Sequence, residues 1–264
     1  MSGLEEFNLA PPVGAVLESF GYTAADAPVR ELVPAATRGT NLVLAAPPSA
    51  RYSMPALAGL VSALAGTTDL GLILAPEHAL EEWAAVVLPV ADAAHLPALA
   101  ANQPNRAARR LREGKLRLLL ATPATALALL ERSALKTDRL RHVVLAWPEL
   151  FESDQALEAV MQDVAAEAQR VLVPAAYRTG HPLMERYARR ALVAGPLATP
   201  AAPVSEKAPV RVAVTGWSRR AAALASLIEA EDPGSVAVWC VDRRSAAEAH
   251  IGLASADPSV QVVT

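Results

Sequence analysis

The sequence predicts an α/β fold in which helices cover both faces of a doubly wound parallel sheet. Two observations lead to this prediction. Short and almost wholly apolar runs recur along the chain, as expected for strands that are buried on both sides. Longer stretches of helical periodicity separate these runs, and alternating strands and helices form right-handed βαβ units. With 264 residues, the chain can form one large domain and part of another.

The first part of the chain contains five expected strands, at residues 41–46, 70–75, 116–121, 142–145 and 171–173. Helical periodicity fills the stretches between and beside them, at residues 54–64, 79–87, 106–112, 124–130 and 155–167. Each helix is long enough to cross back over the sheet, so that consecutive strands can lie parallel.

A break follows this alternation at residues 195–209, which are rich in Pro and Ala and lack periodicity, as is typical of a linker. Beyond it we expect strands at 210–214 and 236–241 and helices at 219–230 and 245–254. We therefore expect a first domain at 1–194, a linker at 195–209 and a partial second domain at 210–264.

The composition favours a globular protein of a reducing compartment. Hydrophobic residues make up 53% of the chain and charged residues 19%, which excludes a disordered chain. The net charge of −3 gives no global attraction to nucleic acid, so any such binding needs a local basic patch. Cys240 is the single cysteine, which excludes a disulfide framework. The start of the chain is acidic and no apolar run is long enough to cross a bilayer, so we expect a cytoplasmic protein with no membrane contact.

The strand expected at 142–145 ends in an unusual way. In nucleotide-hydrolysing α/β proteins, the end of such a strand carries an acid that holds Mg²⁺ and a residue that orients the attacking water. Here Ala146 and Trp147 follow the strand, with Glu149 two residues later. Neither an alanine methyl group nor an indole ring can hold a metal or activate water. We expect Trp147 to act as a plug or as a surface anchor, with base stacking as a further alternative.

A series of short segments resembles the motifs of the DEAD-box RNA helicases, in the family's order and at nearly its spacing. The resemblance runs from about Phe7 to the end of the chain. It implies a RecA-like first domain followed by a truncated second RecA-like unit. The segments that match are 28–30, 39–43, 46–55, 74–80, 121–125, 146–149, 171–176 and 238–248.

Within this resemblance, the polar groups of the family's nucleotide site are replaced. The adenine-reading glutamine falls on Arg30, the coupling hydroxyls fall on Pro174 and Ala176, and no lysine stands in the phosphate-binding loop. The family binds ATP with Mg²⁺, which we do not expect this chain to hold. The degenerate nucleotide site comprises Arg30, Ser49, Ala50, Arg51, Ala146, Trp147 and Glu149.

The segment in place of the phosphate-binding loop contains no glycine. A phosphate cradle needs successive backbone N–H groups that point inwards, which glycine permits. Pro47 and Pro48 instead remove two donors. Two interpretations remain open: the loop is a rigid connection with a solvated Arg51, or Arg51 meets a phosphate.

One basic cluster is a candidate surface for nucleic acid. Arg106, Arg109, Arg110 and Arg112 lie in one expected helix, and Lys115 and Arg117 follow. Such charges can neutralise phosphates, although a solvated helix face is an equally physical explanation. The segment that resembles the family's T-P-G-R motif adds Thr122 and Thr125. The five histidines show no metal-ligand spacing, so we expect no metal site.

Three functional hypotheses follow. The first is a catalytically inactive DEAD-box-like protein, a pseudoenzyme that acts by binding RNA or another nucleic acid. The second is a pseudoenzyme scaffold that binds a protein partner through Trp147 and the ends of the sheet. The third is an ATP-dependent helicase with a non-standard phosphate-binding loop, in which Arg51 supplies the cation.

Overall fold

The structure, a computed structural model, describes residues 3–178, 180, 182–198 and 219–231, with a few single positions between 238 and 253. The chain divides into two units, Met1–Pro203 and Val204–Thr264. The second unit contains helix α9 (Arg220–Glu231), which agrees with the helix expected at 219–230. The other elements expected in the second unit, and most of the expected linker, lie outside the described residues. The expected domain boundaries therefore stay a prediction.

The first unit is built on a seven-stranded sheet with the order β3-β4-β2-β5-β6-β1-β7, in which every neighbouring pair is parallel. This confirms the predicted α/β class and all five expected strands. The strands are β1 (Leu42–Leu44), β2 (Leu70–Leu74), β3 (Ala98–Ala101), β4 (Leu118–Ala121), β5 (Leu140–Ala146), β6 (Gln169–Val173) and β7 (Leu192–Ala194).

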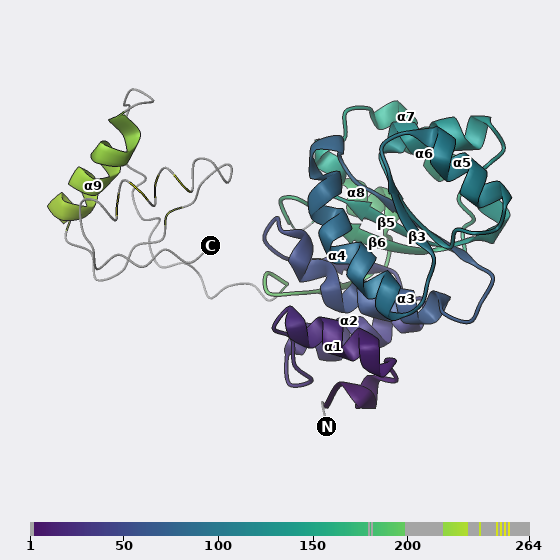
Figure 1. Cartoon of the computed structure of the whole chain (residues 1–264), viewed down its shortest axis with the longest axis horizontal. Coiled ribbons are helices and arrows are strands. Elements are labelled where there is room, and N and C mark those ends of the chain that lie inside the picture. The colour runs from purple at the N-terminus through teal and green to yellow at the C-terminus, as the bar shows by residue number, and fades with distance from the viewer. Residues whose placement is uncertain are drawn as a thin grey trace. The chain divides into compact units, whose positions relative to one another are not determined.

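Helices cover both faces of this sheet (Figure 1). On one face lie α2 (Ala27–Thr37), α3 (Met54–Leu64) and α4 (Leu80–Ala93), and α1 (Pro11–Ser19) packs on α3 and α4 in the same core. The other face packs against α5 (Pro104–Arg112), α6 (Pro123–Glu131), α7 (Asp154–Gln162) and α8 (Pro182–Tyr187). None of the helices in the described residues is both long enough and apolar enough to cross a membrane.

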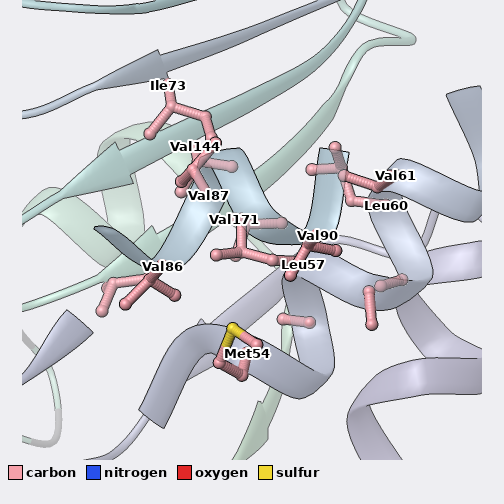
Figure 2. Close-up of a cluster of buried hydrophobic side chains, with 14 of the residues drawn as sticks. Met54, Leu57, Leu60, Val61, Ile73, Val86, Val87, Val90, Val144 and Val171 are labelled. Atoms are coloured by element: carbon pink, nitrogen blue, oxygen red, sulfur yellow. The ribbon is translucent and has the colours of Figure 1, made fainter. Parts of the chain in front are cut away.

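Strand alternation explains why a single sheet supports two cores. Ile73 of β2 belongs to the core beneath α3 and α4, whereas its neighbours Leu72 and Leu74 belong to the opposite core, because successive side chains point to opposite faces. Figure 2 shows the first core, in which residues of α3 and α4 such as Leu57 and Val90 meet side chains of three strands. A strand buried on both faces needs an apolar run, which is the pattern that the sequence displays.

Two helices end at different places from those expected. The helix expected at 79–87 continues to Ala93 and contains Pro89; the ring removes one backbone donor, but the helix face buried around it keeps the turn in place. The helix expected at 155–167 ends at Gln162. Beyond it, the guanidinium group of Arg170 donates to the carbonyl oxygens of residues 165, 166 and 168, which replaces the helical donors.

Five helices and strands of the first unit were not predicted from the sequence: α1, α2, α8, β3 and β7. Helices α1 and α2 both begin with proline in the first turn, which is a helix start signal. Strand β3 is the sequence Ala98-Leu99-Ala100-Ala101, which has low β propensity. It forms at the sheet edge because its backbone pairs with β4.

Gly59 fixes the distance between α2 and α3. A Cβ atom at this position would lie 2.5 Å from the carbonyl oxygen of Val33 and 2.8 Å from the Cβ of Ala36. We expect Gly59→Ala to destabilise the fold by about 2–4 kcal/mol, since backbone must move to relieve the overlap. Gly14→Ala in α1 is the matched control, because its Cβ would lie 3.7 Å from the nearest atom. It should stabilise by about 0.5–1 kcal/mol, and urea unfolding of both variants would show whether the signs are opposite.

A buried polar network joins α2 to β5 and β6. The Gln169 amide donates to the carbonyl oxygens of Ala36 and Thr40, at 3.1 and 2.7 Å. Its Oε1 atom therefore faces His142, whose Nδ1 lies 2.6 Å away. Because Oε1 can only accept, His142 carries its proton on Nδ1.

His142 should make stability depend on pH. Burial lowers the pKa of His142 below 6.5, although the hydrogen bond to Gln169 and the charge of Asp69 oppose the shift. Below pH 6.5 the unfolded chain takes up this proton more readily than the folded chain. The free energy of unfolding that depends on neutral His142 is therefore fully present above pH 6.5 and decreases as the pH falls below it. We expect His142→Asn, which keeps a donor near Nδ1, to flatten this dependence in urea melts between about pH 7.5 and pH 5. Equal slopes for the two proteins would show that another group is responsible.

Candidate functional site

The candidate site lies at the carboxyl edge of the sheet, where β1, β6 and β5 end side by side. In the sheet, β6 lies between β1 and β5. The chain leaving β1 therefore passes over β6 and β5 before it enters β2, which pairs with the opposite side of β5. In open α/β sheets, ligands bind at the carboxyl ends of strands where the strand order reverses. The residues after β1 and β5 are the ones predicted from the sequence to form a degenerate nucleotide site.

The loop after β1 offers no free backbone donors between Pro47 and Ala50. The two prolines have no N–H group. The N–H of Ser49 donates to the carbonyl oxygen of Pro47 at 2.8 Å, and the N–H of Ala50 donates to the Glu82 carboxylate at 2.9 Å. A phosphate cradle depends on such donors, and here the chain itself has used or removed all of them.

Glu82 places a negative charge where a phosphate would meet the loop. It lies in the first turn of α4, and its Oε1 atom accepts from Ala50 at the start of the short 3-10 helix η2 (Ala50–Ser53) that leads into α3. Exposed N–H groups at a helix start attract anions. The Glu82 carboxylate is thus an internal ligand of this position, and it would repel a phosphate brought to the same donor.

Arg51 does not face this loop. Its guanidinium group donates to the carbonyl oxygen of Phe20, the C-cap of α1, where a cation also complements the helix dipole. Tyr22 completes the contact, since its hydroxyl donates to the carbonyl oxygen of Arg51 at 3.1 Å. Burial raises the pKa of Tyr22 to about 12 even though the charge of Arg51 opposes the shift. Arg51, which is exposed, therefore joins the loop to α1 through the Phe20 carbonyl oxygen.

Aromatic rings fill the end of β5. Trp147 is only 5% exposed, and its ring packs edge-on against Trp83 of α4 with ring centroids 5.6 Å apart. Its backbone is left-handed, with a φ of 52°, and its N–H donates to the carbonyl oxygen of Val173 at 2.7 Å. The plug predicted for Trp147 agrees with this burial. The surface-anchor alternative, and with it a partner contact through Trp147, is wrong because the ring is buried.

Glu149 is the one acid of the degenerate site, and it joins the segment after β5 to the segment after β6. Its Oε2 atom accepts from the N–H of Ala175, just beyond β6, at 3.1 Å. Ala146 is completely buried at the end of β5. Arg30 lies exposed in α2. Thus the structure brings Ser49 and Ala50 close to Glu82, and Trp147 close to Trp83, while Arg51 points away to α1.

No signal in the sequence identified Glu82 and Trp83 as members of this site. Glu82 lies 32 residues from its partner Ala50, in a helix that has acidic residues in its first turn, where they are common. The adjacent Trp83 reads as an ordinary core residue. Only the packing of α4 beside η2 and β5 brings both to the candidate site.

The basic cluster divides into two kinds of residue. Arg110 and Arg112 donate to the carbonyl oxygens of Lys115 and Arg132, and Arg117 donates to the backbone of residues 64 and 69. Arg106 and Arg109 are exposed, and neither makes a hydrogen bond or an ion pair with the described part of the chain. These two residues of α5 are therefore the ones available to an external anion.

Thr122 and Thr125 have structural partners. Thr122 caps α6 by accepting from the N–H of Thr125 at 3.1 Å. The Thr125 hydroxyl donates to the carbonyl oxygen of Asn102 at 3.2 Å and is 6% exposed. Together they hold the end of β4 against the segment after β3. Within the described ranges, no group of three His, Cys, Asp or Glu side chains is placed to bind a metal ion.

No family model matches the sequence, and no curated protein matches it. Among solved structures, the chain is similar to a hypothetical ATP-dependent RNA helicase from Sulfolobus tokodaii, with a TM-score of 0.54 and 12% sequence identity. The match covers 70% of this chain and 56% of that one. The chain has a helicase-like RecA fold. At this level of identity the likeness shows the fold alone.

Proposed function

We propose that this chain is a catalytically inactive relative of the DEAD-box RNA helicases, which acts by binding nucleic acid without hydrolysing ATP. The observation that supports inactivity best is the contact between Ala50 and the Glu82 carboxylate. Phosphoryl transfer in this fold depends on positioned donors and cations. Here the loop donors are committed to the chain, and an acid stands beside them.

The second part of the proposal concerns α5. Arg106 and Arg109 are exposed in a protein of net charge −3, so they form a local exception to the overall charge. The helicase-like fold makes RNA the first candidate ligand. Guanidinium groups on one helix face can bind successive phosphates, and that binding weakens as salt displaces it.

The test is a fluorescence-anisotropy titration of a short labelled single-stranded RNA at several salt concentrations. We expect binding that weakens with salt, with a slope of about 0.7 per phosphate contact. Reversing both residues (Arg106→Glu with Arg109→Glu) should reduce that slope by about 1.4 if each contacts one phosphate. The control pair is Arg38→Glu with Lys136→Glu, which changes net charge equally at two exposed sites elsewhere.

Equal losses in the two double variants would remove α5 as the binding surface. No RNA binding by the unmodified chain, together with a protein that co-purifies with it, would favour the scaffold hypothesis instead. RNA binding by α5 and nucleotide binding at the loop after β1 can be tested independently. Arg106 and Arg109 follow the edge strand β3, whereas Ala50 follows β1, which lies on the other side of β5.

A further inference from the structure

A cleft of about 400 Å³ opens at the amino edge of the sheet, at the opposite ends of the strands from the candidate nucleotide site. Asn41, which precedes β1, and Arg170, the second residue of β6, are among its lining residues. Residues of α7, and Arg186, Tyr187 and Arg189 from the end of α8 onward, also line it. No role proposed above involves this cleft.

The cleft is lined by three arginines and one acid. Arg170 donates only to the backbone carbonyl groups after α7, so no carboxylate neutralises its charge within the described residues. Arg189 uses Nε to donate to the carbonyl oxygen of Glu185 at 2.8 Å. Its two terminal nitrogens, in the part of the chain that the structure describes, have no hydrogen-bond partner. Two guanidinium groups thus present uncompensated positive charge to the cleft.

The third arginine, Arg186, forms an ion pair with Glu158 at the protein surface. Arg186 Nη1 lies 2.8 Å from Oε1 of Glu158 on α7, and Asp154 on the same helix also acts on this guanidinium group. Both partners of the pair are exposed, at 54% and 39% of their side chains. Such a pair is weak, so a better anion can replace Glu158 as the partner of Arg186.

The cleft also has an apolar side. Met161 of α7 is buried, and Tyr187 is half-buried with its ring beneath the Arg186 guanidinium at 5.3 Å. A ligand that fits both features carries an anionic group next to a flat or apolar group. The volume falls within the range of small-molecule sites.

We propose that this cleft binds a small molecule that carries a phosphate monoester beside an aromatic group. Guanidinium groups bind phosphate through two parallel N–H donors, and the free terminal nitrogens of Arg189 supply such a pair. Arg170 contributes charge without moving, and Arg186 turns from Glu158 to the ligand. The aromatic group packs on Met161 and Tyr187.

The experiment is a calorimetric titration of phenyl phosphate into the full chain, with inorganic phosphate and phenol as comparison ligands. We expect saturable binding of phenyl phosphate, weaker binding of inorganic phosphate, and none of phenol. Arg189→Gln should weaken phenyl phosphate binding by at least about tenfold, as expected for the loss of a charged hydrogen-bond pair. Glu158→Gln should strengthen it, because the competing carboxylate is gone.

Arg190→Gln is the matched control, since Arg190 is the exposed neighbour of Arg189 but does not line the cleft. It should leave the affinity unchanged, and far-UV circular dichroism checks that all variants fold. The absence of saturable binding, equal losses in the two arginine variants, or weaker binding in Glu158→Gln would overturn the proposal. None of these results depends on whether the chain binds RNA or ATP.

Discussion

Replacing Trp83 with alanine should cost about 3–5 kcal/mol of stability, one of the two largest effects expected of a single side chain in this protein. Trp83 is completely buried in the core beneath α3 and α4. It also packs edge-on against Trp147, a contact worth about 0.5–1.5 kcal/mol beyond area burial. Its loss would leave a cavity beside the loop after β1 and leave Trp147 without its aromatic neighbour. Urea unfolding followed by far-UV circular dichroism measures the change.

Trp83→Phe separates packing from hydrogen bonding. The indole Nε1 of Trp83 has no hydrogen-bond partner among the described residues, so phenylalanine removes a polar group that is costly to bury. It also keeps an aromatic ring opposite Trp147. We expect a much smaller loss than for alanine. A phenylalanine variant as unstable as the alanine variant would mean that Nε1 has a partner that the structure does not show.

Gln169→Leu should destabilise the fold by about 3–5 kcal/mol, because each buried polar group left without a partner costs about 1–3 kcal/mol. The substitution leaves the carbonyl oxygen of Thr40 without its Gln169 donor, whereas the carbonyl oxygen of Ala36 still accepts from the N–H of Gly39. It also leaves the His142 Nδ1 donor facing a methyl group. The matched control is Gln162→Leu on the exposed end of α7, which should change stability by less than about 0.5 kcal/mol.

A double variant tests whether the network acts as a unit. Adding His142→Leu to Gln169→Leu removes both ends of the shortest contact, so the pair should cost less than the sum of the two single changes. The same urea experiment measures this coupling. Strict additivity would show that His142 and Gln169 contribute separately and that the 2.6 Å contact adds nothing.

The strands of the sheet could be predicted from sequence because burial on both faces requires apolar runs. Strands β2, β4 and β5 carry such runs and were found within a few residues. Strand β3 could not be found in this way, since its alanines form a strand only through pairing with β4. The end of α7 was also out of reach, because it depends on Arg170 donating to carbonyl groups that precede it in the chain.

The candidate site was predictable only in part. The prolines after β1 and the tryptophan after β5 are visible in the sequence, and they mark positions that have no proline N–H donor and no acid. What replaces them depends on tertiary packing. Glu82 reaches Ala50 from another helix, and Arg51 turns to α1 because the carbonyl oxygen of Phe20 lies within its reach. Neither contact leaves a local pattern.

The most direct test of the central claim is a calorimetric titration of ATP with Mg²⁺ into the purified chain. The account predicts no saturable binding, because the loop after β1 has no free backbone donor between Pro47 and Ala50 and Glu82 accepts from the N–H of Ala50. Glu82→Ala measured alongside distinguishes the two causes, since any recovery of weak binding would come from the freed N–H of Ala50. Saturable micromolar binding of ATP–Mg²⁺ by the unmodified chain would contradict the account.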